Sequence, residues 1–264
     1  MPSQAMLSTA NLTVGYRNGN RVTEVLKHVD LSLYAGELVC LLGANGIGKS
    51  TLLRTISGIQ PALNGSVNIC GRDLATYTSK ELSKFIGIVY TDRTLAGALT
   101  VEELVSLGRQ PYTGFFGRLD SDDRKVVKEA VEAVGMSYKM HDYVATLSDG
   151  ERQKVMIARA LAQETPIIIL DEPTAFLDVA SRIETMQLLR HLAQSQQKAV
   201  LLSTHDVGLS LPLTHRLWLV TAHSAVMEGT TSQFVADGTL NALFPNRNIT
   251  FDSAVMDFRP SKPE

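Results

Sequence analysis

The chain has 264 residues, 44% hydrophobic and 20% charged, a balance typical of a folded protein of one or two domains and not of a disordered one. Its formal net charge of −2 argues against a protein that works by neutralising a nucleic-acid backbone, so we expect no nucleic-acid partner. The chain has neither an apolar run of the roughly 20 residues that span a bilayer nor a basic and then apolar leader, so an intracellular protein is expected.

The first part of the chain predicts strands. Apolar residues alternate from Leu7 onward, and Asn18 with Gly19 favours a hairpin turn between two strands. The uninterrupted apolar run Leu38–Leu42 is typical of a parallel strand that is buried on both faces. A helix over 50–56 and a short strand over 67–70 are expected to follow.

The middle of the chain, about 76–163, predicts mostly helices. Thr100 and Glu103 have the spacing of a capping box that opens a short helix. Apolar residues recur at helical spacing over 121–134, and a third helix is expected over 150–162. The stretch 108–119, rich in glycine and aromatic residues, predicts a surface loop.

Strands and helices alternate again after residue 163. Buried strands are expected over 167–170, 198–202 and 217–220, and a helix over 179–194. This alternation predicts an α/β fold, in which a mostly parallel sheet is flanked by helices and carries a helical insertion. The pattern weakens from Thr231, and 259–263 are expected to form a mobile tail.

A glycine-rich stretch lies between the strand at Leu38–Leu42 and the helix that follows. Its residues match the phosphate-binding loop pattern, and Thr51 follows them: Gly43, Ala44, Asn45, Gly46, Ile47, Gly48, Lys49 and Ser50. In such a loop the amides point at phosphate oxygens, the lysine meets the β- and γ-phosphates, and the serine hydroxyl binds Mg²⁺. A plain strand-to-helix turn is the alternative, but the flanking elements are those that a phosphate loop requires. The stretch therefore predicts a nucleoside triphosphatase.

Two adjacent acids follow the apolar strand at 167–170. Asp171 can hold Mg²⁺, usually through water, and Glu172 can accept a proton from the attacking water. The alternative is that both are solvated acids in a turn. Beside a phosphate loop, the pair predicts a site for triphosphate hydrolysis.

Further residues resemble the motifs of the ATP-binding-cassette (ABC) ATPases. Leu147–Glu151 (Leu-Ser-Asp-Gly-Glu) is similar to that family's signature, usually Leu-Ser-Gly-Gly-Gln, and Ala175–Asp178 is similar to its D-loop. His205 resembles its switch histidine, and Tyr16 the aromatic residue that stacks on adenine. The alternatives are a satisfied core histidine for His205 and plain hairpin packing for Tyr16.

The resemblance implies an ABC ATPase fold with an antiparallel N-terminal β-subdomain, and ATP hydrolysis with Lys49, Glu172 and His205 as catalytic residues. It also implies a homodimer that sandwiches two ATP molecules, each contacted in trans by one signature: Ser148, Asp149, Gly150 and Glu151. A capping box of Ser148 and Glu151 explains the same residue types locally, and both roles can hold because a helix N-terminus also binds anions.

Three positions depart from the family pattern. Asp149 and Glu151 stand where glycine and glutamine are usual, and repulsion by phosphate leads us to expect that Asp149 points away from the nucleotide. Thr91 stands where the family has its Q-loop glutamine. How Thr91 serves in place of that glutamine is left open. A non-catalytic, nucleotide-gated subunit is therefore one alternative to an ATPase.

The stretch 104–119 resembles the ATPases of bacterial importers for iron-siderophores, haem and cobalamin. The resemblance implies a peripheral subunit on the cytoplasmic face of the inner membrane that powers import of an iron chelate, with haem or cobalamin as alternative cargo. Its partners would be polytopic permease subunits and, indirectly, a substrate-binding protein. A soluble ABC ATPase, for example of the iron–sulfur assembly type, is a further alternative.

The same resemblance predicts how the chain is divided. We expect a single domain over 1–264, with about 5–75 and 164–230 as catalytic core, about 76–163 as helical subdomain and about 231–264 as C-terminal extension. The permease would dock in a groove lined by about 91–116, although the aromatic residues there could instead pack the insertion's own core.

Overall fold

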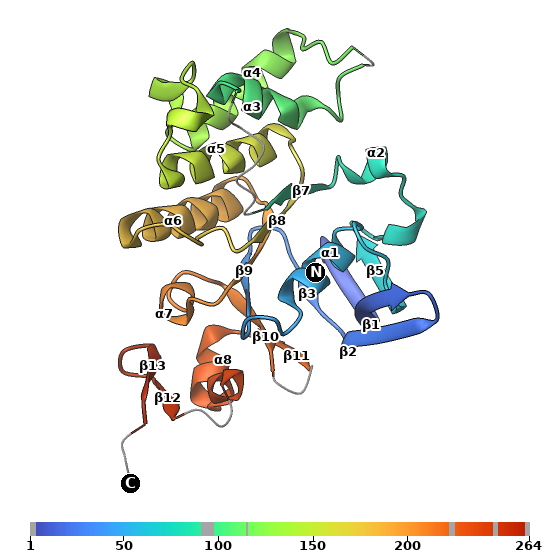
Figure 1. The fold of residues 1–264 in the computed structure, drawn as a ribbon, viewed down its shortest axis with the longest axis vertical. Helices are drawn as coiled ribbons and strands as arrows, with labels where there is room; N and C mark the ends of the chain where they lie inside the picture. Colours follow the sequence, from blue (N-terminus) through green and yellow to red (C-terminus); the bar gives the residue numbers. More distant parts are fainter. Residues whose placement is uncertain (1–3, 91–97, 115, 222–224, 245–247, 262–264) are drawn as a thin grey trace.

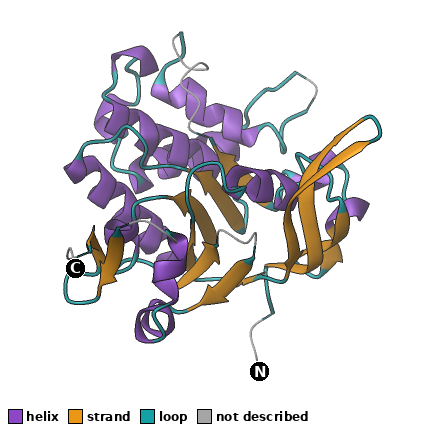
Figure 2. Ribbon diagram, turned by 60° about the horizontal axis from the view of Figure 1, so that its bottom comes forward, coloured by secondary structure: helices purple, strands orange, loops and turns teal. Residues whose placement is uncertain are grey.

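The computed structural model describes residues 4–90, 98–114, 116–221, 225–244 and 248–261 (Figure 1). Its strands form an antiparallel N-terminal sheet, a mostly parallel core sheet and a small C-terminal hairpin. Figure 2 shows most helices gathered on one side of the core sheet and the N-terminal sheet on the other. No described helix combines the length and the apolar composition needed to cross a membrane.

The N-terminal sheet has the strand order β2-β1-β5-β6, with β3 paired to β1. These strands are β1 (Leu7–Asn18), β2 (Arg21–Val29), β3 (Ser32–Leu33), β5 (Asn64–Ile69) and β6 (Arg72–Asp73). The predicted hairpin is confirmed: Asn18 pairs with Arg21, and Gly19 has a φ of 57°, which glycine adopts readily.

The core sheet has the strand order β11-β10-β4-β9-β8-β7, and only the β10–β11 pair is antiparallel. Its strands are β4 (Leu38–Leu42), β7 (Ile86–Val89), β8 (Ile167–Asp171), β9 (Ala199–Thr204), β10 (Arg216–Val220) and β11 (Val226–Gly229). Both faces are buried, as the apolar runs predict: Leu38 and Cys40 pack toward the helices, whereas Val39 and Leu41 pack toward the N-terminal sheet. The carboxyl ends of β4, β8 and β9 therefore share one edge.

Helix α1 (Lys49–Ile56) follows β4 and packs its apolar residues between the two sheets. The helical insertion contains α3 (Val101–Ser106), α4 (Ser121–Ala133) and α5 (Asp149–Ala162), which pack together at the top of Figure 1. Both halves of the predicted capping box of Thr100 and Glu103 are present. Strand β7 lies inside the segment of about 76–163, which is expected to be mostly, not wholly, helical, and it pairs with β8 in the core sheet.

The remaining helices flank the core sheet. They are α2 (Ser79–Leu82), α6 (Val179–Ser195), α7 (Val207–Ser210) and α8 (Thr231–Ala236). Helix α6 covers the sheet on the side of the insertion, and its buried residues join the same apolar cluster as those of α5. Helix α7 begins directly after the carboxyl end of β9.

The C-terminal segment differs from the expected mobile tail. Strands β12 (Ile249–Asp252) and β13 (Asp257–Pro260) form a hairpin in which Thr250 pairs with Arg259. Phe258 contacts Phe244 and Phe251 edge-to-face, with ring centroids 4.9 and 5.5 Å apart. These aromatic contacts stabilise a hairpin whose two short strands, alone, would be marginal in water.

Candidate functional site

The glycine-rich loop turns from β4 into α1 as predicted. Gly46 and Gly48 have φ values of 76° and 115°, a region that other residues rarely adopt. A Cβ at Gly48 would lie 2.5 Å from Val25 Cγ1, so space as well as conformation requires glycine there. Gly48 precedes α1 without a capping side chain, which leaves the first amides of α1 available to an anion.

Lys49 lies across this loop and is only 5% exposed. Its Nζ donates hydrogen bonds to the carbonyls of Gly43 (2.8 Å) and Ala44 (3.2 Å) and lies 4.0 Å from Glu172 Oε1. Burial lowers the pKa of Lys49, and the negative charges of Glu172 and Asp171 partly offset that effect. The result is a cation aimed into the loop, which fits the binding of a polyphosphate.

Residues from β1, β2, the glycine-rich loop, α1 and the carboxyl end of β8 line a hollow of about 380 Å³ beside the loop. They are Tyr16, Val25, Asn45, Gly46, Gly48, Lys49, Ser50, Thr51 and Glu172. Tyr16 is 48% exposed, and its hydroxyl hydrogen-bonds with Thr51 Oγ1 at 2.7 Å. The aromatic ring is therefore fixed at the mouth of the hollow. Ile47, which also belongs to the predicted loop, packs instead against the apolar cluster.

The two adjacent acids stand at the carboxyl end of β8. The Ser203 hydroxyl donates to Asp171 Oδ1 at 2.6 Å, and the Glu172 amide donates to the Ser203 hydroxyl at 2.9 Å. Glu172 has a φ of 49°, which strains a residue with a side chain. The hydroxyl thus ties both acids to β9.

Sequence reasoning missed Ser203. It is fully buried, and its backbone is paired with Asp171 across β8 and β9. The available signal was a polar residue at the end of an apolar strand that was expected to lie beside the acidic one.

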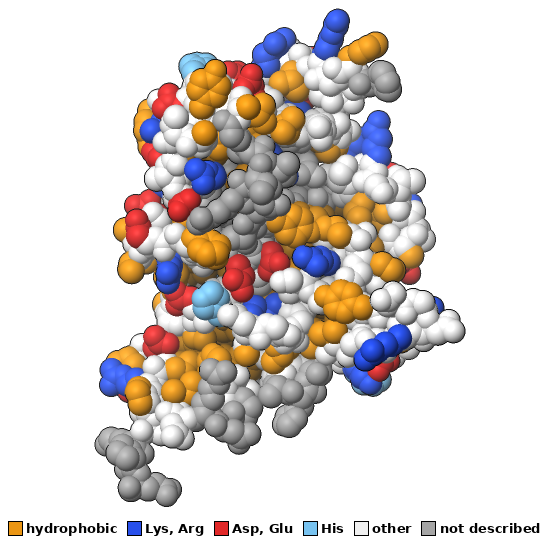
Figure 3. Space-filling view, viewed as in Figure 1, with side chains coloured by type: hydrophobic (Ala, Val, Ile, Leu, Met, Phe, Trp, Pro, Cys, Tyr) orange, Lys and Arg blue, Asp and Glu red, His pale blue; other side chains and the backbone are white. Residues whose placement is uncertain are grey.

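His205 follows β9 and lies next to Glu172. Its Nδ1 is 3.7 Å from Glu172 Oε1, and its side chain is 56% exposed. Asp206, the next residue, caps α7 and lies 3.5 Å from Arg182 NH1, so the chain that carries His205 is fixed on its carboxyl side. Figure 3 shows acidic, basic and histidine side chains gathered over the ends of β8 and β9.

The signature stands apart from the glycine-rich loop of its own chain. Figure 1 shows α1 and α5 in separate parts of the molecule, with β7 and β8 between them. Ser148 caps α5 by accepting from the Glu151 amide at 3.2 Å, and the Glu151 carboxylate accepts from the Ser148 amide at 2.8 Å. The capping box is thus present.

The starts of α5 and α6 abut each other. Asp178 caps α6 by accepting from the Ser181 amide at 2.7 Å, and this bond is the main reason that the pKa of Asp178 lies below its usual value. A Cβ on Gly150 would lie 2.6 Å from Ser181 Oγ, so glycine allows the two helices to approach this closely. Thr91, the Q-loop position, lies outside the described residues.

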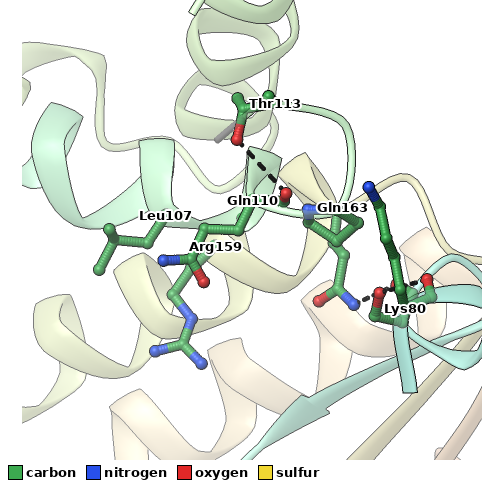
Figure 4. Close-up of a pocket in the computed structure, with 10 residues that line it drawn as sticks. Lys80, Leu107, Gln110, Thr113, Arg159 and Gln163 are labelled. Atoms are coloured by element: carbon green, nitrogen blue, oxygen red, sulfur yellow. Dashed lines mark hydrogen bonds between the residues drawn. The ribbon is translucent and has the colours of Figure 1, made fainter. Parts of the chain in front are cut away.

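A second hollow, of about 660 Å³, lies between α2, the turn after α3 and the end of α5 (Figure 4). Lys80, Leu107, Gln110, Thr113, Arg159 and Gln163 line it and are labelled in Figure 4. Of the described part of the predicted docking groove (98–114 and 116), residues within 107–114 line this hollow, and α2 and α5 supply its other wall.

A buried cluster of charges fixes the loop beside this second hollow. The Arg109 guanidinium bonds to Asp123 (2.8 Å), to Glu164 (2.6 Å) and to the Ala162 carbonyl (2.7 Å), and it stacks 4.2 Å from the ring centre of Tyr112. The hydrogen bond from Arg109 is the main reason that the pKa of Asp123 is lowered. The segment 108–114, which follows α3, is therefore held against α4 and α5.

The donor atoms in the first hollow suit a magnesium ion that arrives with phosphate. Mg²⁺ prefers oxygen ligands and is usually held by one or two carboxylates together with phosphate oxygens. Ser50 lines the hollow, and the Asp171 carboxylate exerts its charge on Lys49 there. Ser50 and Asp171 are thus the residues that would hold the ion.

The comparisons with known proteins agree with this geometry. A family model described as "ABC transporter" matches residues 26–175. Among characterised relatives, the iron(3+)-hydroxamate import ATP-binding protein FhuC of Bacillus subtilis is 36% identical, and the match covers 90% of this chain and 87% of FhuC.

Two solved structures extend the likeness to three dimensions. The first is described as a metal-chelate type ABC transporter in an inward-facing conformation; it has a TM-score of 0.80 and 28% identity over 97% of this chain and 98% of that one. The second is a dimeric ATP-binding cassette bound to ADP and Pi, with a TM-score of 0.73 and 31% identity over 86% of this chain and 99% of that one.

Proposed function

Since the chain belongs to the family of ABC transporter ATP-binding proteins and is an ATPase of that family, we propose that it powers bacterial import of an iron chelate such as a ferric siderophore. The observation that carries the proposal is the grouping of Lys49, Glu172 and His205 at the mouth of the glycine-rich loop. The iron-hydroxamate importer subunit among its relatives supports the substrate class.

Catalysis would proceed from the contacts at the first hollow. Lys49 would exchange its bonds to the loop carbonyls for the β- and γ-phosphates of ATP. Glu172 would accept a proton from the water that attacks the γ-phosphorus; the bond to the bridging oxygen breaks and leaves ADP and phosphate. General-base help of this kind contributes about 10²- to 10⁴-fold. Mg²⁺, held by Ser50 and Asp171, would neutralise charge on the phosphates.

His205 and Tyr16 would position the other groups. His205 lies close enough to Glu172 to orient its carboxylate toward the attacking water. The ring of Tyr16, fixed by Thr51, would stack on adenine. The loop from Gly43 to Thr51 would bind the triphosphate, mainly through the residues that line the hollow: Asn45, Gly46, Gly48, Lys49, Ser50 and Thr51.

The active form would be a homodimer. Ser148 and Gly150 would contact the γ-phosphate bound to the twin subunit, with Asp178 near the shared boundary. The separation of α1 from α5 within one copy supports this arrangement (Figure 1), as does the dimeric relative that holds ADP and Pi.

The dimer would sit on the cytoplasmic face of the inner membrane, bound to polytopic permease subunits and through them to a substrate-binding protein. The second hollow supports a docking site for a permease segment, because Leu107, which lines it, is an apolar side chain that is 41% exposed. Phe116, which lies two residues beyond the lining residue Gly114, is 83% exposed. Phe115, the neighbouring aromatic residue, lies outside the described residues. Residues 5–75 and 164–230 would form the catalytic core, 76–163 the helical subdomain and 231–264 an extension.

The test combines a catalytic variant with transport. The chain is co-expressed with candidate permease subunits, and uptake of ferric siderophore, haem and cobalamin is measured in cells. We expect ferric siderophore uptake in wild type, none in Glu172→Gln, and full uptake in the control Glu132→Gln, an exposed carboxylate on α4. Uptake of haem or cobalamin alone would overturn the substrate class. Equal ATPase rates in wild type and Glu172→Gln would overturn the catalytic assignment.

A further inference from the structure

The start of α5 carries two carboxylates at the end that the proposed function brings to a triphosphate. Asp149 and Glu151 are the first and third residues of the helix. A phosphate chain with several negative charges would be repelled by two bare carboxylates within a few ångströms. The helix N-terminus alone supplies only about half a positive charge.

Both oxygens of Glu151 are engaged within its own subunit. Oε2 accepts from the Ser148 amide at 2.8 Å, and Oε1 accepts from the Tyr138 hydroxyl at 3.0 Å. Lys139 Nζ lies 3.6 Å from the same Oε1, and the two side chains are only 25% and 23% exposed. The hydrogen bond from Ser148 is the main reason that the pKa of Glu151 is lowered, so this carboxylate is ionised at neutral pH.

Cations compensate the charges around this helix start. Arg152 NH1 lies 3.2 Å from Asp149 Oδ1, and its NH2 donates to the Leu147 carbonyl at 3.2 Å. Lys139 is shared between Glu151 and Asp142, whose Oδ2 is also 3.6 Å from Nζ. Lys139 and Tyr138 thus approach the Glu151 carboxylate from the short helix that precedes the signature.

We propose that Lys139 and Tyr138 are positioning residues that hold and neutralise Glu151, so that the triphosphate of the twin subunit meets the Ser148 hydroxyl and helix amides instead of a bare carboxylate. The inference rests on the proposed ATP-sandwich dimer. It explains how this chain keeps an acidic signature functional: glutamate retains the capping bond that glutamine would make, and Lys139 and Tyr138 offset part of its charge locally.

The test measures ATP-driven dimerisation of the full-length chain in a Glu172→Gln background, where hydrolysis is stopped. Sedimentation with Mg²⁺ and ATP gives the dimer dissociation constant at 50 mM and 1 M KCl. We expect Lys139→Gln to weaken the dimer about fivefold at low salt and less than about twofold at 1 M, where the Debye length falls to about 3 Å. Tyr138→Phe removes one hydroxyl from a side chain that is 70% exposed and should weaken the dimer in the same direction.

The decisive variant is the double exchange. With Glu151→Gln also present, Lys139→Gln should change the dissociation constant less than about twofold, because the charge to be neutralised is gone. The matched control is Lys154→Gln, which also removes one positive charge. Lys154 lies on α5 and pairs with Glu184 at 2.6 Å, not with Glu151, so this exchange should leave the dissociation constant unchanged.

Three results would overturn the proposal. One is an unchanged dissociation constant in both Lys139→Gln and Tyr138→Phe. Another is that Lys139→Gln weakens the dimer equally in the Glu151→Gln background, which would mean a purely structural role for Lys139. A third is that Lys154→Gln weakens the dimer as much as Lys139→Gln does. Failure of the proposed function is a different result: the Glu172→Gln parent itself would then form no ATP-dependent dimer, whereas failure of this proposal alone leaves the parent dimer intact.

Discussion

The Ser203 hydroxyl gives the sharpest test of how the two acids are held. Ser203→Ala removes the hydrogen bond to the Asp171 carboxylate (2.6 Å) and the acceptor of the Glu172 amide (2.9 Å). A hydrogen bond to a charged group contributes about 1.5–3 kcal/mol, and a buried amide without a partner costs about 1–3 kcal/mol. Because Ser203 itself is fully buried, water does not readily replace its hydroxyl, and we expect a loss of about 3 kcal/mol in the free energy of unfolding.

Urea denaturation at pH 7.5 measures this loss, and steady-state ATPase assays measure its effect on catalysis. We expect kcat to fall about 10- to 100-fold, because a group misplaced by about 1 Å costs up to about 10²-fold. The control is Ser195→Ala, which removes an exposed hydroxyl bonded to the His191 carbonyl. A loss below about 0.5 kcal/mol with unchanged kcat would refute the role assigned to Ser203.

Two further predictions concern charge and nucleotide binding. Asp123→Asn should lower the free energy of unfolding at pH 7 by about 2 kcal/mol, because it weakens a buried charged bond to Arg109. The pKa of Asp123 in the folded protein lies below its usual value, so the stability that its ionised carboxylate contributes is full above about pH 5 and is lost as the pH falls. The free energy of unfolding of Asp123→Asn, measured from pH 7 to 3, should therefore fall less steeply toward acid pH than that of wild type. An equally steep fall in both proteins would contradict this prediction. Tyr16→Ala should weaken binding of a fluorescent ATP analogue about 10-fold, because one stacking contact is lost. Tyr16→Phe keeps the ring and should bind within about threefold of wild type. Equal losses in both variants would mean that the hydrogen bond to Thr51 matters more than the ring.

The core of the fold could be predicted because two kinds of local signal agree there. Continuous apolar runs such as Leu38–Leu42 can satisfy their burial only inside a sheet covered on both faces, and the structure buries every residue of that run. Capping boxes such as the one at Thr100 mark helix starts through chemistry that is complete within four residues. The glycine-rich loop joins both signals, since it lies between such a strand and a helix.

The tertiary features were harder to predict. Residues 259–260 are an arginine and a proline, which by themselves do not indicate a strand. Their pairing in the hairpin is supported by contacts among Phe244, Phe251 and Phe258, which come from separate parts of the C-terminal segment. Ser203 is one polar residue in an apolar strand, and its role becomes visible only when β9 is placed beside β8. The buried bond of Arg109 to Asp123 joins residues from two elements that each look merely charged in the sequence.

The central claim is that ATP is cleaved between two copies of this chain. A crystal structure of Glu172→Gln with Mg²⁺ and ATP tests it most directly. We predict a symmetric pair in which each nucleotide contacts Gly43–Thr51 of one copy and Ser148 and Gly150 of the other. A nucleotide held by one copy alone, with both signatures facing solvent, would contradict the account.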